Sequence, residues 1–114
     1  MALLANLSGC GKSTSWPLSG VYKGYYAYGF ELSEFVPVGA SEKWWLNGIV
    51  PCKPQYDKDT VANAPNVTPV LYMIVRGTLT TRGKHGHMDA YARELTAQQF
   101  LECRKLLPGE KPNL

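Results

Sequence analysis

Two histidines and an aspartate occupy alternate positions in one short segment of this 114-residue chain. On a strand, His85, His87 and Asp89 would share one face, because strand side chains alternate. Two imidazoles, one carboxylate and an open position are typical of catalytic zinc. The chain has no other histidine, so a fourth ligand or a general base would come from a carboxylate such as Glu31 or Glu34. The alternative makes His85 a solvated turn residue and His87 a hydrogen-bonded histidine of the fold.

A second chemical motif lies near the amino terminus, where Cys10 follows Leu7, Ser8 and Gly9. This stretch resembles the Leu-[Ala/Ser]-[Gly/Ala]-Cys pattern at which bacterial lipoprotein signal peptides are cut. Small residues let the peptidase approach the backbone, and the cysteine thiol then carries the lipid. The preceding residues are fewer than the usual apolar region of about 7–15 residues and include no basic residue. We therefore expect a truncated start, with residues 1–15 forming a signal remnant and a tether.

The same stretch also matches part of a phosphate-binding loop. Gly11, Lys12 and Ser13 fit the end of the pattern G-x-x-x-x-G-K-[ST], but Asn6 stands where its first glycine belongs. Such a loop must open a helix, and Pro17 ends any helix within one turn. The lipoprotein interpretation of Cys10 is therefore favoured over nucleotide binding.

The chain has three cysteines, so assigning Cys10 to a lipid leaves Cys52 and Cys103 as an even pair. In an oxidising envelope these two are candidates for one disulfide. A pair of buried, reduced thiols is the alternative, since a bond also requires Cα atoms within about 7 Å of each other.

Four aromatic side chains form a candidate binding surface: Tyr25, Tyr26, Trp44 and Trp45. Aromatic and basic side chains on OB folds hold single strands or sugars. In the alternative, these rings simply fill a small barrel. The net charge of +3 is mild and the basic residues are dispersed, which disfavours nucleic acid. An envelope protein or a glycan is the predicted partner.

Short strands are predicted to position these residues. Aromatic and β-branched segments predict strands at residues 20–36 (one long strand or a pair), 42–50, 69–80 and 87–95. The third of these is apolar enough to be buried on both faces, and a turn at 81–86 makes it a hairpin with the fourth. Residues 51–69 predict a long loop with one helical turn at most. The final segment, 96–107, fits either a short helix with a capping-box spacing or a closing strand.

One domain is expected, because a chain of this length holds a single core. Several strands, many glycines and one long loop predict a mainly β fold, a small antiparallel OB-like β-barrel with room for one short helix. The barrel is expected to span residues 16–108, followed by a polar tail at 109–114.

Several segments together carry a resemblance to known proteins: residues 22–26, 29–31, 44–45, 77–79 and 83–91. They resemble a group of small bacterial lipoproteins and are similar to the OB-like C-terminal domain of the envelope lipoprotein NlpE. Those proteins carry a Gly-x-x-Gly-His-hydrophobic-Gly-x-Tyr hairpin, which His87, Ala90 and Tyr91 partly match, while Asp89 replaces a glycine. The resemblance covers residues 20–105. It implies an OB-like barrel, an envelope location and no established enzymatic activity.

These observations predict a lipid-anchored bacterial envelope protein on the periplasmic face, acting by binding or structural support and not by catalysis. A small soluble cytoplasmic β-barrel binding protein is the alternative. A metal-dependent activity at His85, His87 and Asp89 is the third possible function. No cofactor is predicted. The lipid would attach the chain to a membrane. The sequence does not indicate an oligomeric state.

Overall fold

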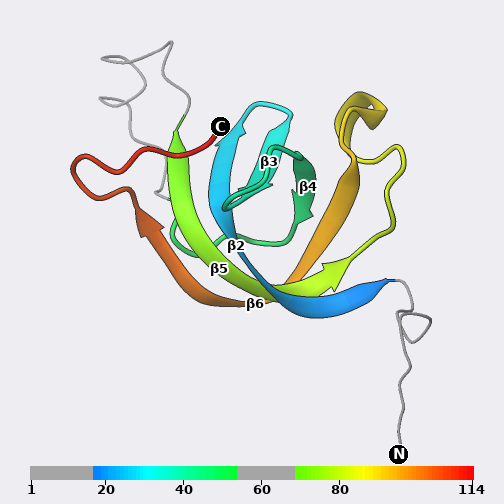
Figure 1. The fold of residues 1–114 in the computed structure, drawn as a ribbon, viewed down its shortest axis with the longest axis horizontal. Coiled ribbons are helices and arrows are strands. Elements are labelled where there is room, and N and C mark those ends of the chain that lie inside the picture. Colours follow the sequence, from blue (N-terminus) through cyan, green and yellow to red (C-terminus); the bar gives the residue numbers. More distant parts are fainter. Residues whose placement is uncertain (1–16, 54–68) are drawn as a thin grey trace, which may run out of the picture.

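Five strands make up most of the computed structural model, which describes residues 17–53 and 69–114. The elements are β2 (Leu18–Gly29), β3 (Leu32–Pro37), β4 (Trp44–Asn47), β5 (Val70–Leu79), the 3-10 turn η2 (His87–Asp89) and β6 (Arg93–Lys105) (Figure 1). The predicted lipid attachment at Cys10 lies outside the described residues, as does most of the predicted long loop. None of the described elements is a helix long and apolar enough to cross a bilayer.

The five strands form one sheet that closes on itself. Hydrogen bonds join them in the order β2-β3-β4-β6-β5, and β5 pairs again with β2. If the five strands are numbered from 1 to 5 in chain order, their order in the sheet is 1-2-3-5-4. This is a Greek-key arrangement of the OB type. The prediction of a mainly β, OB-like barrel is therefore confirmed. It is corrected in one respect, because β4 and β6 run parallel while every other neighbouring pair is antiparallel.

The core follows from the alternation of side chains along the strands. Phe35, Met73, Val75 and Leu95 are fully buried inside the ring. The ring of Phe35 packs where Gly24 has no side chain, since a Cβ there would lie 2.5 Å from Phe35 Cζ. The outer face of β5 is not covered by a second layer, so its residues alternate between buried and partly exposed. The expectation that this strand is buried on both faces was wrong.

The carboxyl-terminal third differs from the prediction in two places. A strand was expected over 87–95, but that segment begins as the η2 turn, and β6 starts only at Arg93. The segment 96–107 was expected to be a short helix or a strand. It continues β6 to Lys105, because its residues complete the sheet beside β5. The predicted strand at 20–36 is a pair, β2 and β3, joined by a turn at Phe30 and Glu31.

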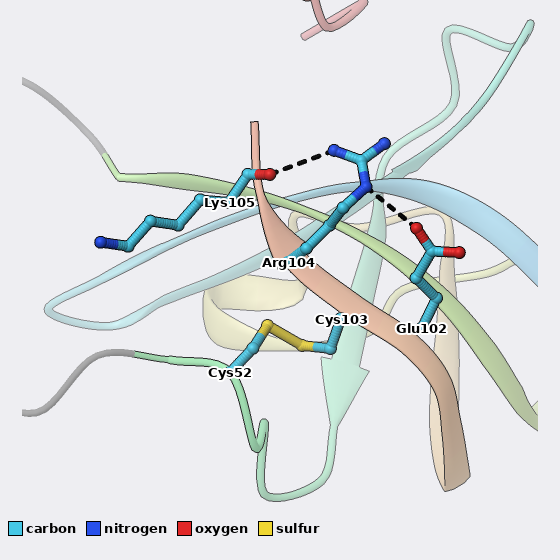
Figure 2. The surroundings of a disulfide bond; sticks show 5 residues. All are labelled: Cys52, Glu102, Cys103, Arg104 and Lys105. Atoms are coloured by element: carbon cyan, nitrogen blue, oxygen red, sulfur yellow. Dashed lines mark hydrogen bonds and ion pairs between the residues drawn. A yellow bond between two sulfur atoms is a disulfide. The ribbon is translucent and has the colours of Figure 1, made fainter. Parts of the chain in front are cut away.

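A disulfide joins Cys52, just after β4, to Cys103 of β6, with the Cα atoms 5.5 Å apart (Figure 2). Both half-cystines pack against the core cluster. In Figure 2 the side chains of Cys103 and Arg104 leave β6 on opposite sides, as expected for consecutive strand residues. The bond therefore fastens the inner face of β6 to the segment that follows β4.

The tail predicted at 109–114 is packed against the barrel. Glu110 accepts hydrogen bonds from Tyr25 Oη (2.9 Å) and Arg104 Nη1 (2.8 Å). Asn113 Nδ2 donates to the carbonyl oxygens of Pro37 (3.1 Å) and Ala40 (2.6 Å). In Figure 1 the tail, drawn in red, crosses β5 and ends beside β2. These contacts attach the tail to the outer face of β2 and to the end of β3.

Reduction of the Cys52–Cys103 bond is expected to lower the free energy of unfolding by about 2–4 kcal/mol, because the bond closes a long loop in the unfolded chain. Urea denaturation with and without reductant measures the loss. A Cys52→Ser, Cys103→Ser double variant should be insensitive to reductant. Thiol counting on the unfolded, unreduced protein should find at most one thiol, from Cys10, and three thiols would refute the bond.

Acid is expected to release the tail only well below the ordinary pKa of a glutamate. Hydrogen bonds from Arg104 and from the backbone of Leu107 lower the pKa of Glu110 from 4.5 to about 2. Because the folded pKa is the lower one, the stabilisation is full above the ordinary value and is lost as the pH falls toward the folded value. NMR shifts of Tyr25 and Asn113 should hold at pH 4 and change below it, whereas Glu110→Gln should weaken the docking at neutral pH.

Candidate functional site

Two connections meet at one end of the barrel. They are the β2–β3 turn at Phe30 and Glu31 and the β5–β6 connection, residues 80–92 (Figure 1). The Nε2 atom of His87, in η2, lies 3.0 Å from Glu31 Oε1. This contact joins the tips of two connections that are more than fifty residues apart in the sequence.

The backbone at both tips is strained. Within the described residues, three residues other than glycine have positive φ angles: Glu31 (54°), Met88 (60°) and Asp89 (55°). All three lie at these tips. Such conformations persist only where surrounding contacts enforce them, and they concentrate at functional sites.

Large apolar side chains project from the same two tips. Phe30 is 92% exposed and Met88 is 82% exposed. Glu31, His87 and Asp89 are exposed beside them. We call these five residues, Phe30, Glu31, His87, Met88 and Asp89, the loop-tip surface. Exposed aromatic and methionine side chains are typical of the centres of protein interfaces.

Trp45, on the outer face of β4, holds the β5–β6 connection in place. Its ring lies edge to face with Tyr91, at 5.3 Å between centroids. The backbone of Gly86 lies against it so closely that a Cβ at residue 86 would be 2.7 Å from three Trp45 atoms. Gly86 also has a φ of 68°, which suits glycine. Trp45 Nε1 donates to Asn47 Oδ1 at 3.1 Å, which fixes the indole.

Carboxylates flank Trp45 on both sides, because Glu34 of β3 and Glu94 of β6 are its partners across the sheet. Glu34 lies 3.6 Å from Lys43 Nζ and accepts a long hydrogen bond from Tyr91 Oη at 3.5 Å. Burial raises the pKa of Tyr91, and the Glu34 charge raises it further. The Tyr91 hydroxyl is therefore neutral at pH 7 and serves as a donor.

The base of the connection is fixed by a second group of charges around Glu42. This carboxylate accepts hydrogen bonds from Trp44 Nε1 (2.6 Å) and Arg93 Nε (2.9 Å) and pairs with Arg82. Burial opposes its ionisation, but these donors and cations outweigh burial and lower the pKa of Glu42. Arg93 also donates to the carbonyl oxygen of Thr80 at 3.1 Å. Glu42 thus stays ionised and ties both ends of the connection to the barrel.

Thr80, His85 and Glu94 form a group with a superficial likeness to a nucleophile, a base and an orienting acid. His85 Nε2 lies 3.2 Å from Thr80 Oγ1 and 3.1 Å from the carbonyl oxygen of Thr81. A carbonyl only accepts, so Nε2 must carry the proton. It then cannot take a proton from Thr80. The Nδ1 atom is 3.8 Å from Glu94, too far for a hydrogen bond. His85 therefore has a structural role, in which its contacts with Thr80 and Thr81 stabilise the start of the β5–β6 connection.

The geometric premise of the metal hypothesis was wrong. His87 and Asp89 lie in the η2 turn and His85 in an isolated bridge with Tyr91, so the three residues do not alternate along a strand. His85 contacts Thr80 and Thr81, while His87 contacts Glu31. Across residues 17–53 and 69–114, no group of three or more histidine, cysteine, aspartate or glutamate side chains is arranged to hold a metal ion.

The four predicted binding aromatics have other surroundings. Tyr26 and Trp44 are core residues, with 3% and 7% of their surface exposed. Tyr25 binds Glu110 of the tail, and Trp45 lies under the β5–β6 connection. The two tryptophans face opposite sides of β4, because consecutive strand residues alternate.

The sequence interpretation missed Phe30 and Met88. For Phe30 the available signal was an apolar residue in a tight turn between two strands, where polar residues are usual, whereas Met88 lay in a segment predicted to be a strand and gave no such signal.

Comparison with known proteins identifies no relative. None of the protein-family models matches the chain, and searches of curated proteins and of solved structures found no similar protein.

Substitution of Gly86 is expected to displace the β5–β6 connection from Trp45. Gly86→Ala adds the cost of a positive φ, about 1–2 kcal/mol, to the cost of a clash, about 1–3 kcal/mol. Gly39→Ala is the matched control, because its φ is 82° and nothing lies within 4 Å of the added Cβ. Urea denaturation followed by tryptophan fluorescence measures both. Equal losses in the two variants would show that the Trp45 contact does not hold the connection.

Proposed function

We propose that this chain is a lipid-anchored bacterial envelope protein whose barrel binds a partner protein through the loop-tip surface. The observation that carries the proposal is the 3.0 Å contact between His87 and Glu31, beside which Phe30 and Met88 stay exposed at 92% and 82%. Burying two large side chains of this kind contributes roughly 1.5–3 kcal/mol each.

A protein partner fits this surface better than a glycan. Of the predicted binding aromatics, Trp45 lies nearest to this surface, but it is covered by Gly86 and contacts Tyr91 edge to face, so it offers no free face to a sugar. Phe30 and Met88 are side chains that insert into apolar pockets. The partner pocket is therefore expected to be apolar at its centre.

The charge around the loop-tip surface indicates what should surround that pocket. Glu31 and Asp89 are exposed, and the turn and the η2 segment contain no lysine or arginine. This acidic margin contrasts with the net charge of +3 of the whole chain. A partner with lysine or arginine at the rim of its pocket would complement it.

The envelope location rests on Cys10 and its neighbours. The motif from Leu7 to Cys10 supplies the lipid attachment in this proposal. The Cys52–Cys103 bond is compatible with an oxidising compartment. A soluble cytoplasmic binding protein is the alternative, and the experiment below separates the two.

Photocrosslinking in the native host tests the binding surface. A crosslinking amino acid at position 30 and, separately, at position 88 should capture the same partner. The same amino acid at Val21, which is 50% exposed on the outer face of β2, should not. Capture from position 88 should fall at least tenfold in a Phe30→Ser background. Capture from position 21 equal to that from position 30 would refute the surface.

Fractionation of the same cells tests the anchor. The wild-type chain, expressed with its full upstream reading frame, should sediment with membranes and carry acyl chains, while Cys10→Ala should not. If both forms are soluble and uncleaved, the lipoprotein assignment fails. The crosslinking result then decides independently whether the loop-tip surface binds a partner.

A further inference from the structure

A second built site lies on the outer face of β2, β5 and β6, away from the loop-tip surface. Tyr25, Tyr72 and Arg104 are neighbours across these three strands. The Tyr25 and Tyr72 rings are 5.5 Å apart and meet edge to face. The Arg104 guanidinium lies over the Tyr72 ring, 4.3 Å from its centroid. We call these three residues the carboxylate cradle.

The cradle holds one carboxylate with several donors. The Glu110 carboxylate accepts hydrogen bonds from Arg104 Nη1 (2.8 Å) and Nη2 (3.3 Å) and from Tyr25 Oη (2.9 Å). The backbone N–H of Leu107 adds a fourth bond at 2.8 Å. Two guanidinium nitrogens, one on each carboxylate oxygen, make the planar, bidentate geometry that distinguishes arginine from lysine. Three of the four donors belong to the barrel and one to the tail itself.

Contacts within the sheet also position the cradle. Arg104 Nε donates to Glu102 at 2.9 Å and Nη1 to the carbonyl oxygen of Lys105 at 3.1 Å (Figure 2). The Tyr72 ring supports the flat face of the guanidinium. A site whose donors are fixed before the ligand arrives loses less side-chain entropy when it binds.

An apolar position of the outer face lies beside the cradle. Val36 is the partner of Tyr25 across the sheet and therefore lies on the outer face, yet it is only 1% exposed. The tail is bonded to residues next to this position, to Tyr25 through Glu110 and to Pro37 and Ala40 through Asn113. The ligand that fits the site is therefore a peptide segment that carries an acidic side chain.

We propose that Tyr25, Tyr72 and Arg104 form a recognition site for an acidic peptide segment, and that Glu110 of the chain's own tail occupies it in cis. A partner segment with a glutamate replaces the tail, and its carboxylate takes the place of Glu110 between Arg104 and Tyr25. This site is separate from the loop-tip surface and does not depend on it.

The experiment adds a nine-residue peptide with the sequence of residues 106–114 to the full chain carrying Glu110→Ala. NMR shifts of the Tyr25 and Tyr72 rings report binding. The variant should bind the peptide at least tenfold more tightly than the wild type does, because the wild-type tail competes at an effective concentration on the order of 1 mM. A peptide with glutamine in place of its glutamate should bind at least tenfold more weakly.

Arg104→Lys in the Glu110→Ala background is the matched receptor control. It keeps the charge but loses the bidentate geometry, so peptide affinity should fall at least fivefold while the Cys52–Cys103 bond and the fold persist. Equal binding of the glutamate and glutamine peptides would overturn the proposal, since the site would not recognise a carboxylate. Absence of peptide binding to a folded Glu110→Ala chain would overturn it as well.

Discussion

Closure of the barrel depends on β4, a strand of only four residues. Its edges pair with β3 on one side and with β6 on the other, and the second of these pairings is parallel. Trp44 fills the core while its neighbour Trp45 faces outward, because consecutive strand residues alternate. One short segment therefore joins the two halves of the sheet, packs the interior and supports the β5–β6 connection. A shift of one residue in its register would exchange all of these contacts.

The strained loop tips are a consequence of that support. Positive φ angles at Glu31 and Met88 cost about 1–3 kcal/mol each, which no local preference of these residues offsets, whereas aspartate adopts this conformation more readily at Asp89. In the β5–β6 connection the offset comes from contacts at the base, where Glu42 binds Arg93 and Trp44 and where Trp45 meets Gly86. The β2–β3 turn is tied to this connection through the contact of Glu31 with His87, and Phe30 stays exposed beside that contact. An exposed apolar surface maintained in this way is preorganised for a partner.

The sequence predicted the strands better than it predicted their neighbours in space. Alternation and β-branched residues identified β2, β3 and β5, because these signals are local. The parallel pairing of β4 with β6 is a contact between distant segments and leaves no local pattern. His85, His87 and Asp89 have the spacing of a strand face, but the tertiary contacts of Trp45 with Gly86 and Tyr91 impose a turn on that segment. The roles of Tyr25 and Glu110 depend on a tail that composition described only as polar.

The two proposed surfaces are held by different parts of the barrel. The β4 strand ends at Asn47, so within the described residues the second half of β6 pairs with β5 alone. That half is secured from its two faces, by the disulfide at Cys103 on the inside and by the Arg104–Glu110 contact on the outside. The β5–β6 connection, which carries His87, Met88 and Asp89 of the loop-tip surface, is held instead by Trp45 of β4 through its contact with Tyr91. Loosening the end of β6 should therefore disturb the carboxylate cradle before it reaches Phe30 and Met88, because Arg104 lies in that half of the strand and no residue of the loop-tip surface does.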